Sequence, residues 1–277
     1  MPSLLEKGRL FRELHYGCRA FIIPNPWDVG TARLLVNLGF QALATTSAGY
    51  AFSVGKRDGD VERDAITTHI SAIAFAVDVP ISADLQNGFE HAPEAVAESI
   101  RLAAEAGAVG GSIEDATGHA DEPIYDKGYA AERIRAATEA ARRLPHPFTL
   151  TARAENYLYD RSNLKDTIER LQAYQEAGAD VLYAPGLRTQ EDIRELVRSV
   201  DRPVNVLMGI PGLELNLSAL SELGVRRVSV GSALSRVALG AFLRAAHEMQ
   251  SSGTFKFADQ AISYAELNGL FGAEDRR

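Results

Sequence analysis

Two short apolar runs of the chain end in carboxylate side chains. Residues 79–83 read as a buried, β-prone strand, and their polar continuation begins at Asp84. Residues 109–113 form a second small and apolar run, which ends in Glu114 and Asp115. Parallel strands joined by helical crossovers place their carboxyl ends on one face, so these acids are expected to converge on one site. The alternative is that each acid caps the helix that follows it.

Other strand-like runs also end in polar side chains, and their exits carry Asp28, Thr46 with Ser47, Arg153 with Glu155, and Asn205. Acids that face a water-filled centre repel one another unless a cation lies among them. A set of oxygen ligands without histidine favours Mg²⁺ or Mn²⁺ over zinc. Because Mg²⁺ retains several waters, we expect Asp84 to bind it directly and Glu114 and Asp58 to bind it through water.

Arg153 is the cation among these exits. Its planar guanidinium suits bidentate binding of a carboxylate or a phosphonate. The alternative role is a salt bridge to Glu155 or Glu114. A metal and an arginine together would hold a small dianion, and a metal chelated by a 2-oxo acid would stabilise an enolate while the adjacent bond breaks.

Eight strand-like runs alternate with helical patterns along the chain. Strands are expected at residues 21–23, 42–46, 79–84, 109–113, 148–152, 181–184, 204–207 and 227–231. Helices are expected at 3–16, 29–38, 63–77, 92–106, 130–143, 164–177, 191–200, 215–223, 234–249 and 257–270, with a long polar loop after residue 47. This alternation predicts a (β/α)8 TIM barrel with extra N-terminal and C-terminal helices. A doubly wound open sheet is the second choice, although no Gly-x-Gly-x-x-Gly turn follows the first strand.

Length and composition bound the classes of protein that fit. The 277 residues, 46% of them apolar and 24% charged, predict one soluble globular domain over 1–277. A net charge of −8 argues against a nucleic-acid partner and still allows a small anionic substrate. No apolar run approaches the roughly twenty residues that span a membrane, and the charged N-terminus lacks a signal sequence, so a cytoplasmic location is expected. Cys18 is the single cysteine, which excludes a disulfide or a cysteine zinc site within one chain.

The region 232–277 holds helices that exceed the needs of one barrel. Surplus terminal helices with apolar side chains commonly pack on a partner subunit. We therefore expect residues 232–277 to contribute to a homo-oligomer.

Several motifs in this order resemble the isocitrate lyase/phosphoenolpyruvate mutase (phosphonomutase) superfamily. They are Asn25-Pro26-Trp27-Asp28, Ser47-Ala48-Gly49, the stretch Ser82 to Phe89, Ser112-Ile113-Glu114-Asp115, and Thr151-Ala152-Arg153-Ala154-Glu155. The resemblance implies a (β/α)8 barrel that uses Mg²⁺, or Mn²⁺, to make or break C–C or P–C bonds in 2-oxo carboxylates or their enol forms. It also implies a homotetramer, a dimer of dimers, in which the eighth helix is exchanged between paired subunits; a homodimer is the smaller alternative.

The resemblance also implies roles for residues at the matching positions. Asp84 corresponds to the metal-binding aspartate, and Glu114 and Asp58 complete the metal shell. The substrate-binding positions are Thr46, Ser47, Ala48, Arg153 and Asn205. The catalytic candidates are Arg153, Asp58 and His119, of which His119 is the general-acid candidate because histidine titrates near neutral pH.

The sequence departs from the superfamily pattern at several positions. Gln86 stands where a second acid is usual, and Glu90 stands where a glycine is usual. The loop 116–127 lacks the Lys-Lys-Cys-Gly-His stretch of isocitrate and methylisocitrate lyases, which argues against these cysteine-dependent activities. The Lys-x-Asn element of the P–C bond enzymes is also missing.

Three functional hypotheses follow. The first is a Mg²⁺-dependent lyase-type enzyme that acts on a small 2-oxo or 2-hydroxy carboxylate, oxaloacetate-like, through an enolate. The second is a P–C bond enzyme of the phosphoenolpyruvate mutase or phosphonopyruvate hydrolase type. The third is a barrel that binds a 2-oxo acid without turnover.

Overall fold

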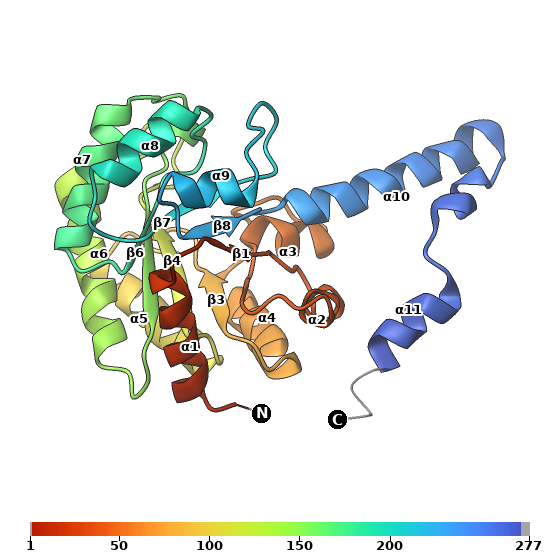
Figure 1. Ribbon diagram of the computed structural model, residues 1–277, viewed down its shortest axis with the longest axis horizontal. Helices are drawn as coiled ribbons and strands as arrows, with labels where there is room; N and C mark the ends of the chain where they lie inside the picture. The colour runs from red at the N-terminus through yellow and green to blue at the C-terminus, as the bar shows by residue number, and fades with distance from the viewer. Residues whose placement is uncertain (1, 273–277) are drawn as a thin grey trace.

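A computed structural model describes residues 2–272 of the chain. Its eight parallel strands follow the order β1-β8-β7-β6-β5-β4-β3-β2 (Figure 1). The strands are β1 (Phe21–Ile23), β2 (Leu43–Ala44), β3 (Ile81–Asp84), β4 (Gly110–Glu114), β5 (Thr149–Arg153), β6 (Val181–Tyr183), β7 (Val204–Leu207) and β8 (Arg227–Ser229). The ring closes where the amide of Ala44 in β2 donates to the carbonyl of Pro24, directly after β1, at 3.1 Å. The predicted (β/α)8 barrel is confirmed.

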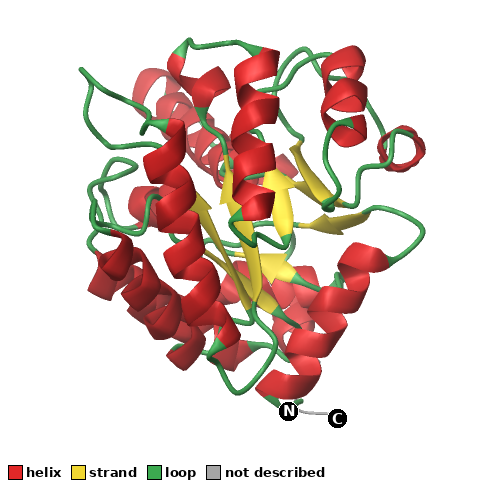
Figure 2. Ribbon diagram, turned by 90° about the vertical axis from the view of Figure 1, so that its left-hand side faces the viewer, coloured by secondary structure: helices red, strands yellow, loops and turns green. Residues whose placement is uncertain are grey.

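Helices surround the strands (Figure 2). They are α1 (Leu4–Tyr16), α2 (Val29–Asn37), α3 (Ser47–Ser53), α4 (Arg63–Ala76), α5 (Pro93–Glu105), α6 (Lys127–Arg142), α7 (Leu164–Glu176), α8 (Gln190–Arg198), α9 (Leu217–Glu222), α10 (Ala233–Ser252) and α11 (Tyr264–Phe271), with 3₁₀ turns η1 (Asn156–Tyr159) and η2 (Lys256–Gln260). Within residues 2–272, no helix combines the length and apolar character needed to cross a bilayer.

Two segments differ from the expected elements. The loop predicted after residue 47 begins with the short helix α3, whose first turn is capped by Thr46: its hydroxyl accepts from the amide of Gly49 at 3.2 Å. The single helix predicted at 257–270 is broken into η2 and α11, because Ala261 is extended and Ser263 starts a new capped helix. In both segments a capping residue determines where the helix begins, and the hydrophobic periodicity does not.

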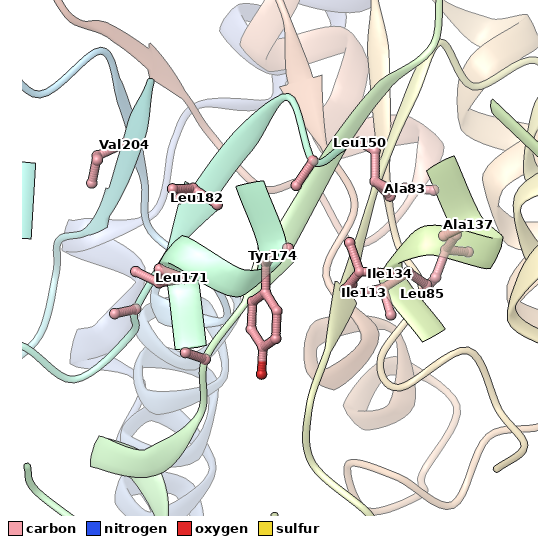
Figure 3. Close-up of a cluster of buried hydrophobic side chains, with 14 of the residues drawn as sticks. Ala83, Leu85, Ile113, Ile134, Ala137, Leu150, Leu171, Tyr174, Leu182 and Val204 are labelled. Carbon is pink, nitrogen blue, oxygen red and sulfur yellow. The ribbon is translucent and has the colours of Figure 1, made fainter. Parts of the chain in front are cut away.

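The apolar core lies between the strands and the helices. Outward-facing side chains of the strands, among them Ile113, Leu150 and Leu182, pack against residues of α6 and α7 such as Ile134 and Leu171 (Figure 3). The inward-facing positions of the strands carry mainly small or polar side chains, which are buried inside the barrel. They are Ser82, Ser112, Thr149, Thr151, Asn205, Arg227 and Ser229. The barrel interior is therefore polar.

Helix α1 packs against the start of the strands. An added Cβ at Gly110, the first residue of β4, would lie 2.5 Å from the ring of Phe11, so glycine is needed there for the helix to approach. His15 is also buried, with its ring edge-on to Phe11 and to Phe21 of β1. This contact covers the amino-terminal ends of the strands and leaves the opposite end open.

Helix α10 projects away from the barrel, and α11 returns toward α2 (Figure 1). The side-chain Nδ2 of Asn37 donates to the carbonyl of Leu270 at 2.6 Å, which fastens the end of α11 to α2. Ser235 is the buried residue of α10. The long helix thus leaves much of its apolar surface uncovered within one chain.

Candidate active site

A cavity of about 1080 Å³ opens at the carboxyl ends of the strands and continues into the polar interior. Six of the predicted site residues line it: Ser47, Ala48, Asp58, Asp84, Glu114 and Arg153. They come from the start of α3, which follows β2, from the ends of β3, β4 and β5, and from the loop after α3. The strand exits therefore converge as expected from parallel topology.

Arg153 is the centre of the acidic group. Its Nη1 lies 3.2 Å from Oδ1 of Asp84, its Nη2 lies 3.1 Å from Oε2 of Glu114, and its Nε lies 2.8 Å from Oε1 of Glu155. The side chains of Arg153, Asp84 and Glu114 are about 15% exposed and that of Glu155 is 3% exposed. The salt bridges considered as an alternative role for Arg153 are present, and all four side chains line the cavity.

The acids in this group carry perturbed pKa values. Burial raises the pKa of Glu114 well above its usual range, and the charges of Glu155, Asp84 and Asp58 add to the rise against the opposing effect of Arg153. Burial and the neighbouring Asp84 also raise the pKa of Asp58. The charged forms of these carboxylates are therefore destabilised by lost hydration and mutual repulsion.

Ser47 joins the exits of β2 and β3. Its backbone amide donates to Oδ2 of Asp84 at 2.9 Å, and its hydroxyl donates to Oδ1 of Asp58 at 3.3 Å. The amide of Asp84 in turn donates to the hydroxyl of Thr45 at 2.8 Å. The first turn of α3 thus positions two of the three predicted metal ligands.

The loop after Asp84 is held in a strained form by an arginine from α6. Gln86 and Phe89 adopt left-handed backbone conformations with φ of 51° and 71°, which are unfavourable for side chains with a Cβ. Arg133, buried beneath the loop, donates to the carbonyls of Asn87, Glu90 and His91, the last two at 2.8 and 3.0 Å. These bonds fix the loop that leaves β3.

Three predicted site residues are not among the described residues that line the cavity. The Thr46 hydroxyl caps α3, and the Asn205 side chain donates to Ser229 and accepts from Arg227, each at 2.9 Å. His119 lies in the outer loop, where its Nε2 is 3.0 Å from Nε2 of His91. The structure does not bring these residues into contact with the acidic group.

Asp115 turns away from the cavity although it follows Glu114 directly. Its carboxylate accepts from the hydroxyl of Tyr174 at 2.6 Å, from Arg170 at 3.1 Å and from the amide of Glu155 at 2.8 Å. The carboxylate of Asp28 accepts from the amide of Thr31 at 2.7 Å. Asp28 therefore caps the helix that follows it, as the alternative predicts, whereas Asp115 caps none of the described helices and joins β4 to α7.

Residues that the sequence analysis did not single out also line the cavity. The Tyr183 ring lies 5.2 Å from the Arg153 guanidinium, and burial raises the pKa of Tyr183 to about 12. Asn25 joins β2 and β8, because its side chain donates to the carbonyl of Thr45 and accepts from the amides after Ser229. Arg227 lies in the strand expected at 227–231, and its alternation with Ser229 is the sequence signal for its place inside the barrel.

The donor set fits a hard divalent cation. All three predicted ligands offer carboxylate oxygens. The pKa values of Asp58 and Glu114 are raised by burial first and by neighbouring carboxylates second, and a cation would offset that repulsion. Within residues 2–272, no three His, Cys, Asp or Glu side chains form a group that could hold a metal ion by itself. That Asp84 binds the metal directly, with Glu114 and Asp58 through water, stays a prediction.

Comparison with known proteins identifies the family. Residues 11–250 match the family model for phosphoenolpyruvate phosphomutase. A protein of Burkholderia cenocepacia J2315, provisionally described as a lyase/mutase, is 60% identical, with a TM-score of 0.95 over 98% of this chain and 97% of the other. An uncharacterized protein of Mycobacterium tuberculosis is 33% identical over 258 residues, 93% of this chain and 94% of the relative. The structure of oxaloacetate acetylhydrolase with its product oxalate is 25% identical, with a TM-score of 0.86 over 97% and 95% of the two chains. This chain belongs to the phosphoenolpyruvate phosphomutase family, within the isocitrate lyase/phosphoenolpyruvate mutase superfamily that its motifs resemble.

Proposed function

We propose that this protein is a Mg²⁺-dependent, or Mn²⁺-dependent, lyase-type enzyme that makes or breaks a C–C bond in a small, oxaloacetate-like 2-oxo or 2-hydroxy carboxylate through an enolate. The observation that carries the proposal is the buried contact of Arg153 with Asp84 and Glu114 at the mouth of a polar barrel cavity. The similarity to oxaloacetate acetylhydrolase, whose structure holds the product oxalate, supports the substrate class.

The charge balance of the cavity supports the metal requirement. Asp58, Asp84, Glu114 and Glu155 surround the one guanidinium of Arg153 in this part of the cavity, so a bound anionic substrate would be repelled by the surplus of carboxylates. A divalent cation held by Asp84, with Glu114 and Asp58 through water, would supply a Lewis acid that stabilises negative charge on the substrate oxygen.

The protein side chains orient the substrate and move protons. Arg153 presents a planar donor to a substrate carboxylate, and the Ser47–Ala48 turn lines the wall beside it. Asp58 lines the cavity, and burial followed by the charge of Asp84 raises its pKa, which favours its use as a group that exchanges protons with the substrate. The role of His119 as general acid stays a prediction. Because His119 lies beside His91 in the outer loop, we propose Asp58 as the stronger candidate for this role.

Cysteine chemistry is excluded from the proposal. Cys18 is exposed, follows α1, and is not among the described residues lining the cavity. The loop 116–127 supplies His119, Asp121 and Tyr125 in place of a thiol. We therefore propose a reaction unlike that of the cysteine-dependent isocitrate and methylisocitrate lyases. A P–C bond reaction is the second candidate, favoured by the match to the phosphoenolpyruvate phosphomutase model.

We also propose that the active form is a homotetramer, or a homodimer, in which α10 packs on a neighbouring subunit. Large apolar side chains are exposed along the C-terminal region: Val237, Leu239, Phe242, Leu243, Met249, Phe255, Ile262, Tyr264 and Leu267. Exposed large apolar side chains on a projecting helix and the segment after it are typical of a subunit interface.

The test is metal-dependent turnover of a panel of 2-oxo, 2-hydroxy and phosphono acids, with pyruvate, glyoxylate, oxalate and phosphate measured as products. We expect C–C cleavage of a 2-oxo or 2-hydroxy acid that stops when EDTA is added. Asp84→Asn should abolish it, whereas Glu98→Gln, an exposed acid paired with Arg101 on α5, should leave it unchanged. Phosphate release from phosphonopyruvate would favour the second candidate, and metal-dependent binding without any product would favour a binding protein.

A further inference from the structure

Arg227 is a buried cation that lacks an acidic partner. It begins β8, is 4% exposed and lines the cavity. Its Nε donates to Oδ1 of Asn205 at 2.9 Å, while its Nη1 is buried without a hydrogen-bond partner. No carboxylate in residues 2–272 lies within ion-pair distance of it. Burial of an unpaired guanidinium is costly, so its position calls for a ligand.

The other arginines around the barrel are compensated. Arg133 donates to three backbone carbonyls, Arg170 pairs with Asp115 and Asp166, and Arg153 pairs with three acids. Arg63 also lines the cavity and has a buried Nε without a hydrogen-bond partner, but it pairs with Glu90 at 3.6 Å. Among the arginines that line the cavity in residues 2–272, Arg227 is the one without an ion pair. The buried guanidinium without an ion pair therefore lies in the interior of the barrel.

The surroundings of Arg227 do not remove its charge. Burial, together with the like charge of Arg153, lowers the pKa of Arg227 to about 10, so it remains a cation at neutral pH. His15, on the α1 side, has its pKa lowered to about 3, by burial first and by Arg227 second, so it is neutral and offers no anion. The nearby Tyr183 is also neutral, because burial raises its pKa to about 12.

Arg227 and Arg153 face one cavity from different strands. Arg153 ends β5 and Arg227 begins β8, three strands further along the sheet. Neighbouring strands lie about 4.8 Å apart, so the two backbone positions are about 14 Å apart along the wall. Both side chains line the cavity, so a ligand with an anionic group at each end can contact one guanidinium with each group.

We propose that Arg227 binds a second, distal carboxylate of the substrate, so that the enzyme selects dicarboxylates over monocarboxylates of the same 2-oxo or 2-hydroxy type. The proximal carboxylate would lie at Arg153 and the distal one deeper in the barrel, beside Asn205 and Ser229. This inference rests on the proposed function, because it assigns the remaining part of the same substrate.

The test uses three 2-hydroxy acids that differ at one end: malate, its distal amide, and lactate. Binding to the full-length protein in Mg²⁺ is measured by calorimetry. We expect the wild-type protein to bind malate about 10- to 100-fold more tightly than lactate or the amide, the range of a buried charged hydrogen bond. Arg227→Gln should reduce malate affinity to that of lactate and leave lactate affinity within about threefold. Arg226→Gln, the adjacent arginine outside the cavity lining, is the matched control and should change neither.

The amide comparison needs no variant, so it decides the matter even if Arg227→Gln fails to fold. Equal wild-type affinity for malate and its amide, or equal loss of malate and lactate binding in Arg227→Gln, would overturn the role of Arg227 while the proposed function stands. Failure of the wild-type protein to bind either acid in Mg²⁺, with no turnover of the wider panel, would overturn the proposed function and this inference together.

Discussion

The guanidinium of Arg153 lies 3.2 Å from the carboxylate of Asp84, although β5 and β3 are separated by β4. Within the sheet, Arg153 is directly opposite Glu114, and Asp84 is opposite Ser112. The small side chain at Ser112 leaves space inside the barrel, so the long arginine can reach across β4 to the aspartate. The ion pair therefore depends on the polar, loosely filled interior of this barrel.

Removal of Arg153 should cost stability in a way that depends on pH. Arg153→Gln leaves Asp84, Glu114 and Glu155 buried without their counter-charge, which we expect to lower the free energy of unfolding by about 3–5 kcal/mol at pH 7.5. The pKa values of Glu114 and Glu155 are raised, by burial first, so these two acids take up protons more readily than exposed acids as the pH falls. The loss should therefore be smaller at pH 5, as measured by urea unfolding.

The matched control for this variant is Arg101→Gln, which removes an exposed arginine paired with Glu98 and Glu105 on α5. Its unfolding midpoint should be close to that of the wild-type protein at both pH values, because exposed ion pairs contribute little. An equal loss for Arg153→Gln at pH 5 and pH 7.5 would contradict the role assigned to the buried acids.

Asp58 and His119 can be separated by their kinetics. Asp58 lines the cavity, whereas His119 lies against His91 in the outer loop. We expect Asp58→Asn to lower kcat by about 100-fold or more, the scale of lost acid–base catalysis, and His119→Gln to lower it by less than about tenfold. A larger effect of His119→Gln than of Asp58→Asn would instead identify the histidine as the proton donor.

The strand exits could be predicted from sequence because simple rules govern them. Alternating strand and helix patterns define parallel topology, and parallel topology brings Asp84, Glu114 and Arg153 to one end of the barrel. The direction in which each side chain points was harder to predict. On β7 and β8, Asn205 and Arg227 begin or lie near the start of very short strands, where one residue of error exchanges inside and outside.

Other parts of the site depend on contacts between distant segments. Helix α3 has small residues without apolar periodicity, and its clearest local signal is the cap at Thr46. The position of His119 depends on His91, which belongs to another loop. Hydrophobic periodicity therefore predicts a loop where α3 forms, and the chemistry of histidine alone points to His119 without giving its position relative to the cavity.

The buried histidine in α1 should make the protein sensitive to acid. Burial lowers the pKa of His15 to about 3, below its ordinary value of 6.5. Between these values the unfolded chain binds a proton that the folded chain does not, so the free energy of unfolding falls as the pH is lowered from 6.5 toward 3. At pH 5 the cost from His15 is about 2 kcal/mol.

His15→Phe should make the free energy of unfolding depend less on pH. Phenylalanine keeps an aromatic ring against Phe11 and Phe21 but has no titrating group. The readout is the change in unfolding free energy between pH 7 and pH 5, which is independent of any uniform loss of stability. His247→Phe, at an exposed position of α10, should keep the wild-type slope. Parallel slopes for His15→Phe and the wild-type protein would show that His15 does not carry the effect.

The exposed apolar side chains of α10 lead to a prediction about assembly. Val237 and Phe242 are 69% and 67% exposed in one chain, so a monomer would gain little from them. If α10 packs on a neighbouring subunit, Val237→Glu and Phe242→Glu place charges in an apolar interface, which is costly without a partner. We expect each variant to sediment as a smaller species than the wild-type oligomer while its thermal unfolding remains cooperative.

The control is Gln250→Glu, at an exposed polar position of α10, which should preserve the mass of the wild-type oligomer. A monomeric wild-type protein, or an oligomer unaffected by both substitutions, would show that this face serves another purpose.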